Sequence, residues 1–197
     1  MFRSLLVCMT LLLPWSVKAD PQVWQKEWPQ TDFSRSSVPD WTQIRSGGVR
    51  KDGIPALDRP QFVEAPEARN LKPREPVITL ELEGAPARAY PLRYLTWHEI
   101  VNDVVAGVSL AVTYCPLCNS AVSFDRRTAV GTLSFGVSGK LRHSDMVMYD
   151  RESQSWWQQA TGTGIVGRLT GTQLKTLPSW VESWQPRLAA GTAGQGR

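Results

Sequence analysis

The sequence has few of the residues from which metal sites are usually assembled, with three cysteines and two histidines among its 197 residues. A closed zinc site needs about four ligands, commonly from a second CxxC pair or a His pair, and neither is present. The chain also has only a small excess of charge of one sign. The net charge is +4, and it falls to +2 without residues 1–19, which hold two basic residues and no acidic one. This balance favours neither a nucleic acid nor a membrane surface as a partner.

Long apolar runs are absent after residues 1–19, where a basic start and the run "LLVCMTLLLPW" end in small residues at Ala19. This run is shorter than the ~20 residues that span a bilayer. The pattern predicts an export signal cleaved after Ala19, and a periplasmic or secreted product without a stable membrane anchor. Because Cys8 would leave with the signal, the mature chain keeps only Cys115 and Cys118, and a disulfide can persist in such a compartment.

The remaining chain divides by composition into an arm, a domain and a tail. Residues 20–60 are rich in Pro, Gly, Ser and Asp, which predicts turns and loops. This arm is expected to pack on the domain, because a solvated segment rarely carries three tryptophans, here Trp24, Trp28 and Trp41. Residues 61–185 are predicted to form one β-rich domain, and the low-complexity residues 186–197 a disordered tail.

Short runs of alternating apolar and polar residues follow one another through the domain. Such alternation, interrupted by Gly, Pro or Asn, predicts a mainly β fold, as an antiparallel sheet or a small barrel or sandwich, with an α+β fold as the alternative. The predicted strands are "VITLELE" (77–83), "ARAYPL" (87–92), "VSLAVTY" (108–114), "AVSFD" (121–125), "TLSFGV" (132–137) and "MVMYD" (146–150).

One segment instead has the spacing of a short helix near residues 96–106. Thr96 and Glu99 have the spacing of a capping box, so Glu99 is interpreted as a cap, and Gly107 would end the helix. Between them lies an apolar stripe at helical spacing, formed by Trp97, Ile100, Val101 and Val104.

The stretch "VTYCPLCNSAVSF" places a CxxC pair between two predicted strands. Cys115 and Cys118 would lie in a tight turn at the tip of a hairpin, where both sulfurs can point the same way. Asn119 fits a backbone position with positive φ, for which asparagine is the best choice after glycine.

Three functions are compatible with this pair. The leading hypothesis is a thiol/disulfide redox centre acting on a protein or small-molecule thiol or disulfide, with His98 assisting and Arg126 or Arg127 as alternative cations. A second is a zinc or copper site formed by Cys115, Cys118 and His98, and the sequence assigns no cofactor to the redox centre. A third is a non-catalytic interaction module with a structural disulfide, which is disfavoured because closing so short a loop contributes little stability.

The sequence also resembles the bacterial domain-of-unknown-function family number 3179. The resemblance rests, in order, on "SGGVRKDGIPALDRPQF", "ARAYPLRYLTWHEIVND", "VTYCPLCNSAVSFDR", "LSFGVSGKL" and "SDMVMYDRESQSWW". It implies no settled activity. Some members are selenoproteins, which implies that selenium can stand in the motif of Cys115 and Cys118 and favours redox chemistry. His143 stands where the family tends to have asparagine, so it is not expected to be an essential ligand.

Overall fold

The computed structural model describes residues 21–185 and 191–195 and confirms a mainly β fold built from antiparallel sheets. The expected export signal at 1–19 lies outside the described residues. Within them the helical elements are short: α1 (Gln22–Gln25), α2 (Leu92–His98) and two 3-10 turns, η1 (Trp41–Gln43) and η2 (Ala65–Glu67).

The strands form three large sheets and a two-stranded ribbon, β8 (Arg127–Thr128) with β9 (Gly131–Thr132). Sheet A has the order β1 (Ile44–Ser46), β10 (Phe135–Arg142), β11 (Asp145–Asp150), β12 (Trp156–Gln158), β13 (Thr163–Val166). Sheet B has the order β14 (Thr176–Leu177), β7 (Ser120–Asp125), β6 (Val108–Cys115), β5 (Ile100–Val105). Sheet C has the order β15 (Ser179–Ser183), β3 (Pro76–Leu80), β4 (Ala87–Pro91), β16 (Gly191–Gln195), β2 (Gln61–Glu64).

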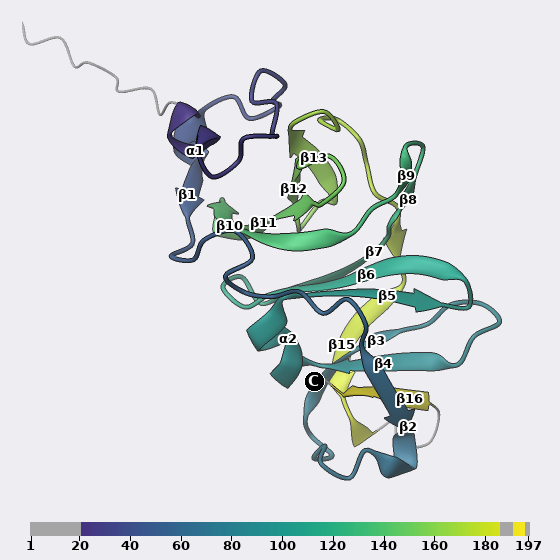
Figure 1. Ribbon diagram of the computed structural model, residues 1–197. Coiled ribbons are helices and arrows are strands. Elements are labelled where there is room, and N and C mark those ends of the chain that lie inside the picture. The colour runs from purple at the N-terminus through teal and green to yellow at the C-terminus, as the bar shows by residue number, and fades with distance from the viewer. Residues whose placement is uncertain (1–20, 186–190, 196–197) are drawn as a thin grey trace, which may run out of the picture.

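Sheet B is the middle layer, between sheet A above it and sheet C below it in Figure 1. Alternate residues of β6 face opposite ways. Ala111 and Cys115 join a core cluster with Phe135, Met146 and other residues of sheet A. The intervening residues of β6 join a second cluster with sheet C. The CxxC pair therefore begins at a strand covered on both faces.

The short helix is present, but it covers Leu92–His98 and not residues 96–106. It ends where Glu99 takes a positive φ of 58°. The apolar residues that follow form β5, which pairs with β6 along its whole length. Ala106 and Gly107, with φ of 48° and 77°, make the two-residue hairpin turn between these strands, so Gly107 turns a hairpin and does not cap a helix.

The arm lies on the outer face of sheet A. Strand β1 pairs with β10, and Trp24 and Trp28 pack edge-on against Trp156 of β12, with ring centroids 5.6 and 5.3 Å away. In the tail, where composition predicts disorder, residues 191–195 form β16 between β4 and β2. The other residues of the predicted tail, 186–190 and 196–197, lie outside the described residues.

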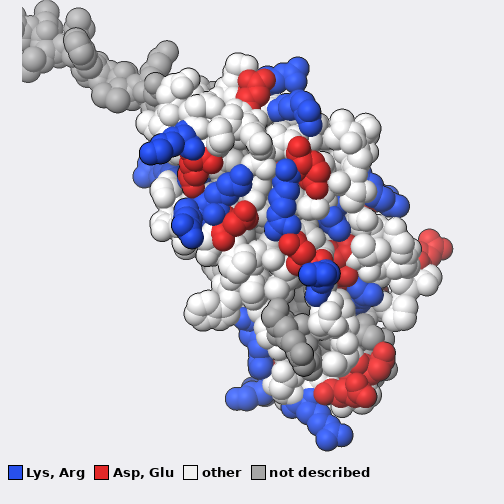
Figure 2. All heavy atoms as spheres, viewed as in Figure 1, with Lys and Arg blue, Asp and Glu red and all other residues white. Residues whose placement is uncertain are grey.

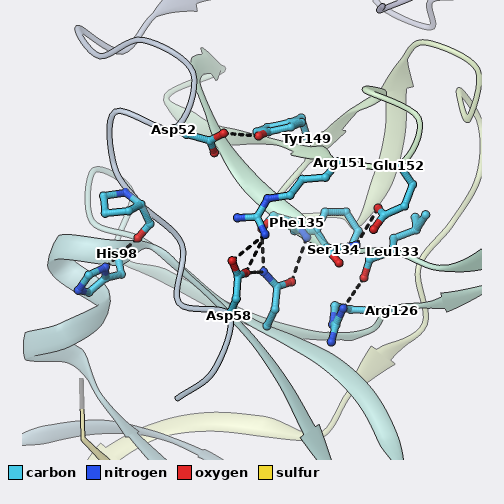
Figure 3. A network of polar contacts seen from close by, with 12 residues as sticks. Asp52, Asp58, His98, Arg126, Leu133, Ser134, Phe135, Tyr149, Arg151 and Glu152 are labelled. Carbon is cyan, nitrogen blue, oxygen red and sulfur yellow. Dashed lines mark hydrogen bonds and ion pairs between the residues drawn. The ribbon is translucent and has the colours of Figure 1, made fainter. Parts of the chain in front are cut away.

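A network of polar contacts fixes the arm's residues 51–58 against sheets A and B (Figure 3). The Asp58 carboxylate accepts hydrogen bonds from Asn102 Nδ2 and Arg151 Nη1, each at 2.8 Å. Tyr149 donates its hydroxyl proton to Asp52. These contacts hold the arm over the edge where the two sheets meet.

The surface carries charges of both signs. On the face shown in Figure 2, basic and acidic side chains are interspersed and neither sign forms a continuous surface. Neither α-helix in the described part of the chain combines the length and the apolar composition needed to cross a membrane.

Candidate functional site

The CxxC pair lies at the tip of the β6–β7 hairpin, as the sequence predicts. Cys115 pairs with Ser120 at the last position of the ladder, so residues 116–119 form the loop. Asn119 has the expected positive φ, 50°, and its Oδ1 accepts a hydrogen bond of 2.9 Å from the Tyr114 hydroxyl. This bond ties the loop to the end of β6.

The two thiols lie in different environments. Cys115 is 1% exposed, whereas Cys118 is exposed, and both are free thiols in the structure. Burial raises the pKa of the Cys115 thiol to about 11, although the backbone N–H groups of Cys118 and Met146 act in the opposite direction. Solvent and external reagents therefore reach Cys118 first, and Cys115 stays protonated at neutral pH.

Asp145 is the carboxylate of this site. Its Oδ1 accepts a hydrogen bond from the Cys118 thiol, with 3.4 Å between oxygen and sulfur, while Oδ2 accepts hydrogen bonds from Gln158 Nε2 and from the Ala160 N–H at 3.0 Å. The side chain is buried, with 7% exposed. Because Gln158 and Ala160 fix the carboxylate, it presents one oxygen to the sulfur without rotating.

A tight turn brings Asp145 to the cysteines. Arg142 and Asp145 close the β10–β11 hairpin, and the two turn residues, His143 and Ser144, have φ of 54° and 64°. This turn type favours Asn and Gly, so the chain holds two less suitable residues in the left-handed region. Asp145 is the first residue of β11 after this turn.

Ser120 supplies a second polar contact to the exposed thiol. Its Oγ lies 3.0 Å from Cys118 Sγ and 2.9 Å from Gln159 Oε1. Gln159 is fully buried and its Nε2 donates to Thr113 Oγ1 at 3.0 Å. The Ser120 hydroxyl donates its one hydrogen to Gln159, so its oxygen faces Cys118 Sγ as an acceptor, and Asp145 is the second acceptor beside the thiol.

Glu99 lies beside the buried cysteine. Together with Cys115, Leu117 and Met146 it lines a small cavity of about 40 Å³ under the loop. Burial raises the pKa of the Glu99 carboxyl to about 7. Near neutral pH the carboxyl can therefore hold or release a proton at the cavity that Cys115 also lines.

We expect Glu99→Gln to remove part of the pH dependence of folding. The folded-state pKa is raised from 4.5 to about 7, so the contribution of the protonated group is fully present below pH 4.5 and is lost as the pH rises to about 7. After discounting for solvent screening, the loss is about 1–2 kcal/mol. Urea unfolding of both proteins from pH 4 to 8 measures it. The exposed Glu67→Gln is the control, and parallel curves for Glu99→Gln and wild type would contradict the prediction.

The structure places the other predicted site residues elsewhere. His98 is the last residue of α2, not in its first turn, and its Nδ1 bonds to the Pro55 carbonyl at 2.7 Å (Figure 3). Arg126 and Arg127 follow β7 at the end of the hairpin opposite to the cysteines. Arg126 donates to backbone carbonyls, including that of Leu110, and Arg127 pairs with Asp125. None of these contacts reaches the thiols.

The donor atoms that could hold a metal are those of Cys115, Cys118 and Asp145, which all lie within 4.8 Å of one another. Among the described residues this is the one such group, and it does not include His98. Two thiolates and a carboxylate are ligands that zinc accepts, and they would leave one tetrahedral position open.

Sequence reasoning missed Asp145 and underrated Glu99. Asp145 follows Cys118 by 27 residues, and only the packing of sheet A on sheet B brings them together. The local signal was the turn before it, "RHSD", at the start of a predicted strand. Glu99 was interpreted as an N-terminal cap, whereas it follows the C-terminus of α2.

Comparisons with known proteins gave one family. Searches of curated proteins and of solved structures gave no match. Residues 51–193, which include the loop, Glu99 and Asp145, match the model of the family described as "Protein of unknown function (DUF3179)". The match covers well over half of the chain, so the protein belongs to this family of unknown function.

Proposed function

We propose that the protein is an exported thiol/disulfide exchange protein in which Cys118 attacks and Cys115 resolves. The observation that carries this proposal is the asymmetry of the pair: an exposed thiol hydrogen-bonded to a fixed carboxylate stands beside a buried thiol. A structural disulfide needs neither the carboxylate nor the exposure. Export is the part of the proposal that rests on the sequence of residues 1–19 alone.

The proposed exchange transfers two electrons from the Cys115–Cys118 dithiol to a substrate disulfide. Cys118 gives its proton to Asp145, and the thiolate attacks one sulfur of a substrate disulfide. A Cys118–substrate disulfide forms, and the other half leaves as a thiolate that takes up the proton. Cys115 then attacks Cys118 Sγ, the Cys118–substrate bond breaks, and the Cys115–Cys118 disulfide forms. The proton that Cys115 loses passes to the sulfur of the second half, which leaves as a thiol. The dithiol is oxidised and the substrate disulfide is reduced.

The second candidate function is metal binding, which the three converging donors favour. In this case Cys115, Cys118 and Asp145 would hold zinc or copper, and the metal would supply Lewis-acid or electron-transfer chemistry. The chain would contribute the ligands, and the buried Gln158 would orient the Asp145 carboxylate through its hydrogen bond.

A redox titration with elemental analysis tests the proposal. We expect metal-free protein to show a reversible two-electron couple, with a potential above the roughly −300 mV limit of buried structural disulfides, because one sulfur is exposed. Alkylation followed by peptide mass spectrometry reports Cys115 and Cys118 separately from Cys8. Near-stoichiometric metal without a measurable couple would replace the redox function with the metal site.

A further inference from the structure

A second pocket lies next to the thiol site. It has a volume of about 440 Å³ and is lined by residues of η1, β1 and the β10–β11 turn: Thr42, Gln43, Arg45, Leu141, His143 and Ser144. Its size falls within the ~300–1,000 Å³ of small-molecule sites. Ser144 precedes Asp145, whose carboxylate is 3.4 Å from Cys118 Sγ. Leu141 of this pocket also lines the small cavity that Cys115 and Leu117 share, so the pocket borders the loop of the two cysteines.

The lining is cationic and contains no carboxylate. Arg45 and Leu141 are cross-strand partners of β1 and β10, so their side chains stand on the same face of sheet A. Arg45 is exposed, and none of the ion pairs among the described residues involves it. The nearby carboxylate of Asp40 accepts a hydrogen bond from the Thr42 N–H.

Arg142 does not line the pocket, but it holds Gln43, which does. It follows Leu141 on β10, so its side chain stands on the face of sheet A opposite to Arg45. Arg142 donates from Nε and Nη2 to Gln43 Oε1, at 3.1 and 3.0 Å, and from Nη1 to Gln158 Oε1 at 3.5 Å. These acceptors are neutral, so they orient the guanidinium without cancelling its charge. Arg45 is thus the guanidinium that lines the pocket and is available to an anionic group, which a guanidinium recognises through paired hydrogen bonds.

We infer that this pocket binds the carboxylate end of a low-molecular-mass disulfide and presents its sulfur to Cys118. The inference rests on the proposed exchange function and names its substrate class: a small peptide-like thiol, in its disulfide form, that carries free carboxylates. This disulfide is the oxidant of the exchange. One half joins Cys118 and leaves when Cys115 displaces it, and both halves depart as thiols.

The first arm of the test measures rates. Reduced protein is mixed with oxidised glutathione, which carries carboxylates, or with 2-hydroxyethyl disulfide, which is uncharged. We expect Arg45→Gln to slow the first reaction about fivefold and to leave the second unchanged, since the lost interaction is one exposed charge-assisted contact. The control is Arg74→Gln, an exposed arginine in the loop before β3. An equal response of both reagents to Arg45→Gln would overturn the inference.

The second arm measures binding without redox chemistry. S-methylglutathione keeps the carboxylates but has no free thiol. Its affinity is measured by NMR titration of two proteins, Cys118→Ser and the double variant Cys118→Ser with Arg45→Gln. Saturable binding that weakens about fivefold with Arg45→Gln is expected. If it binds in this way but neither disulfide reacts, the pocket stands and the exchange function falls. If the disulfides react but binding is absent or independent of Arg45, the pocket falls and the function stands.

Discussion

Cys118→Ser is expected to react with a small disulfide at least about a thousandfold more slowly than the wild-type protein. A serine hydroxyl does not attack a disulfide, so only Cys115 could react in its place. Its thiol has a pKa of about 11 and is 1% exposed. At pH 7 a thiol of this pKa is ionised in about one molecule in 10⁴, and its greater intrinsic nucleophilicity recovers part of that loss. Stopped alkylation with mass detection gives the rate.

Cys115→Ala is the matched variant for the same reaction. It keeps the attacking thiol and removes the resolving one, so we expect the first step to proceed and the protein to stop as a mixed disulfide at Cys118. Urea unfolding shows that each variant is folded at the assay temperature. Fast reaction of Cys118→Ser together with an unreactive Cys115→Ala would reverse the roles of the two cysteines.

Gly139→Ala is expected to cost about 3 kcal/mol of unfolding free energy. Gly139 lies at the irregularity of β10 between Val137 and Lys140, with φ of 73°. A Cβ there would stand 2.2 Å from the Val49 carbonyl oxygen, so the arm would have to move. That movement also stretches the hydrogen bond of 2.8 Å from the Gly47 N–H to the Gly139 carbonyl.

Gly171→Ala separates backbone strain from this clash. Gly171 has a similar φ of 85°, but an added Cβ would meet no atom within 4 Å. Its expected cost is therefore the strain alone, about 1 kcal/mol. Urea unfolding of both variants and wild type measures the difference, and equal losses at the two glycines would show that the arm does not press on β10.

The β hairpin of the site could be predicted because its signals are local. Alternation on both sides of the loop, two cysteines three residues apart and Asn119 all act within residues 108–125, and the ladder from Leu110–Asp125 to Cys115–Ser120 follows from them. The helix was misplaced because residues 100–105 satisfy both a helical stripe and a strand. Pairing with β6 and burial in the middle layer decided for the strand.

The partners of the thiols could not be predicted from spacing. Asp145 reaches the site from another sheet, and its position depends on how sheet A packs on sheet B. His98 was a candidate as a histidine of the predicted helix, and its Nδ1 is bonded to the Pro55 carbonyl. Local sequence signals identify candidate site residues, whereas long-range packing decides which side chains contact the thiols.

The arm is synthesised before the strands on which it packs. Trp28 leaves the ribosome early, yet it packs on Trp156 of β12, and β1 pairs with β10. Roughly 130 residues separate the two tryptophans. The arm therefore has no surface to pack on until β10 and β12 are in place, so the segment made first depends on strands made later.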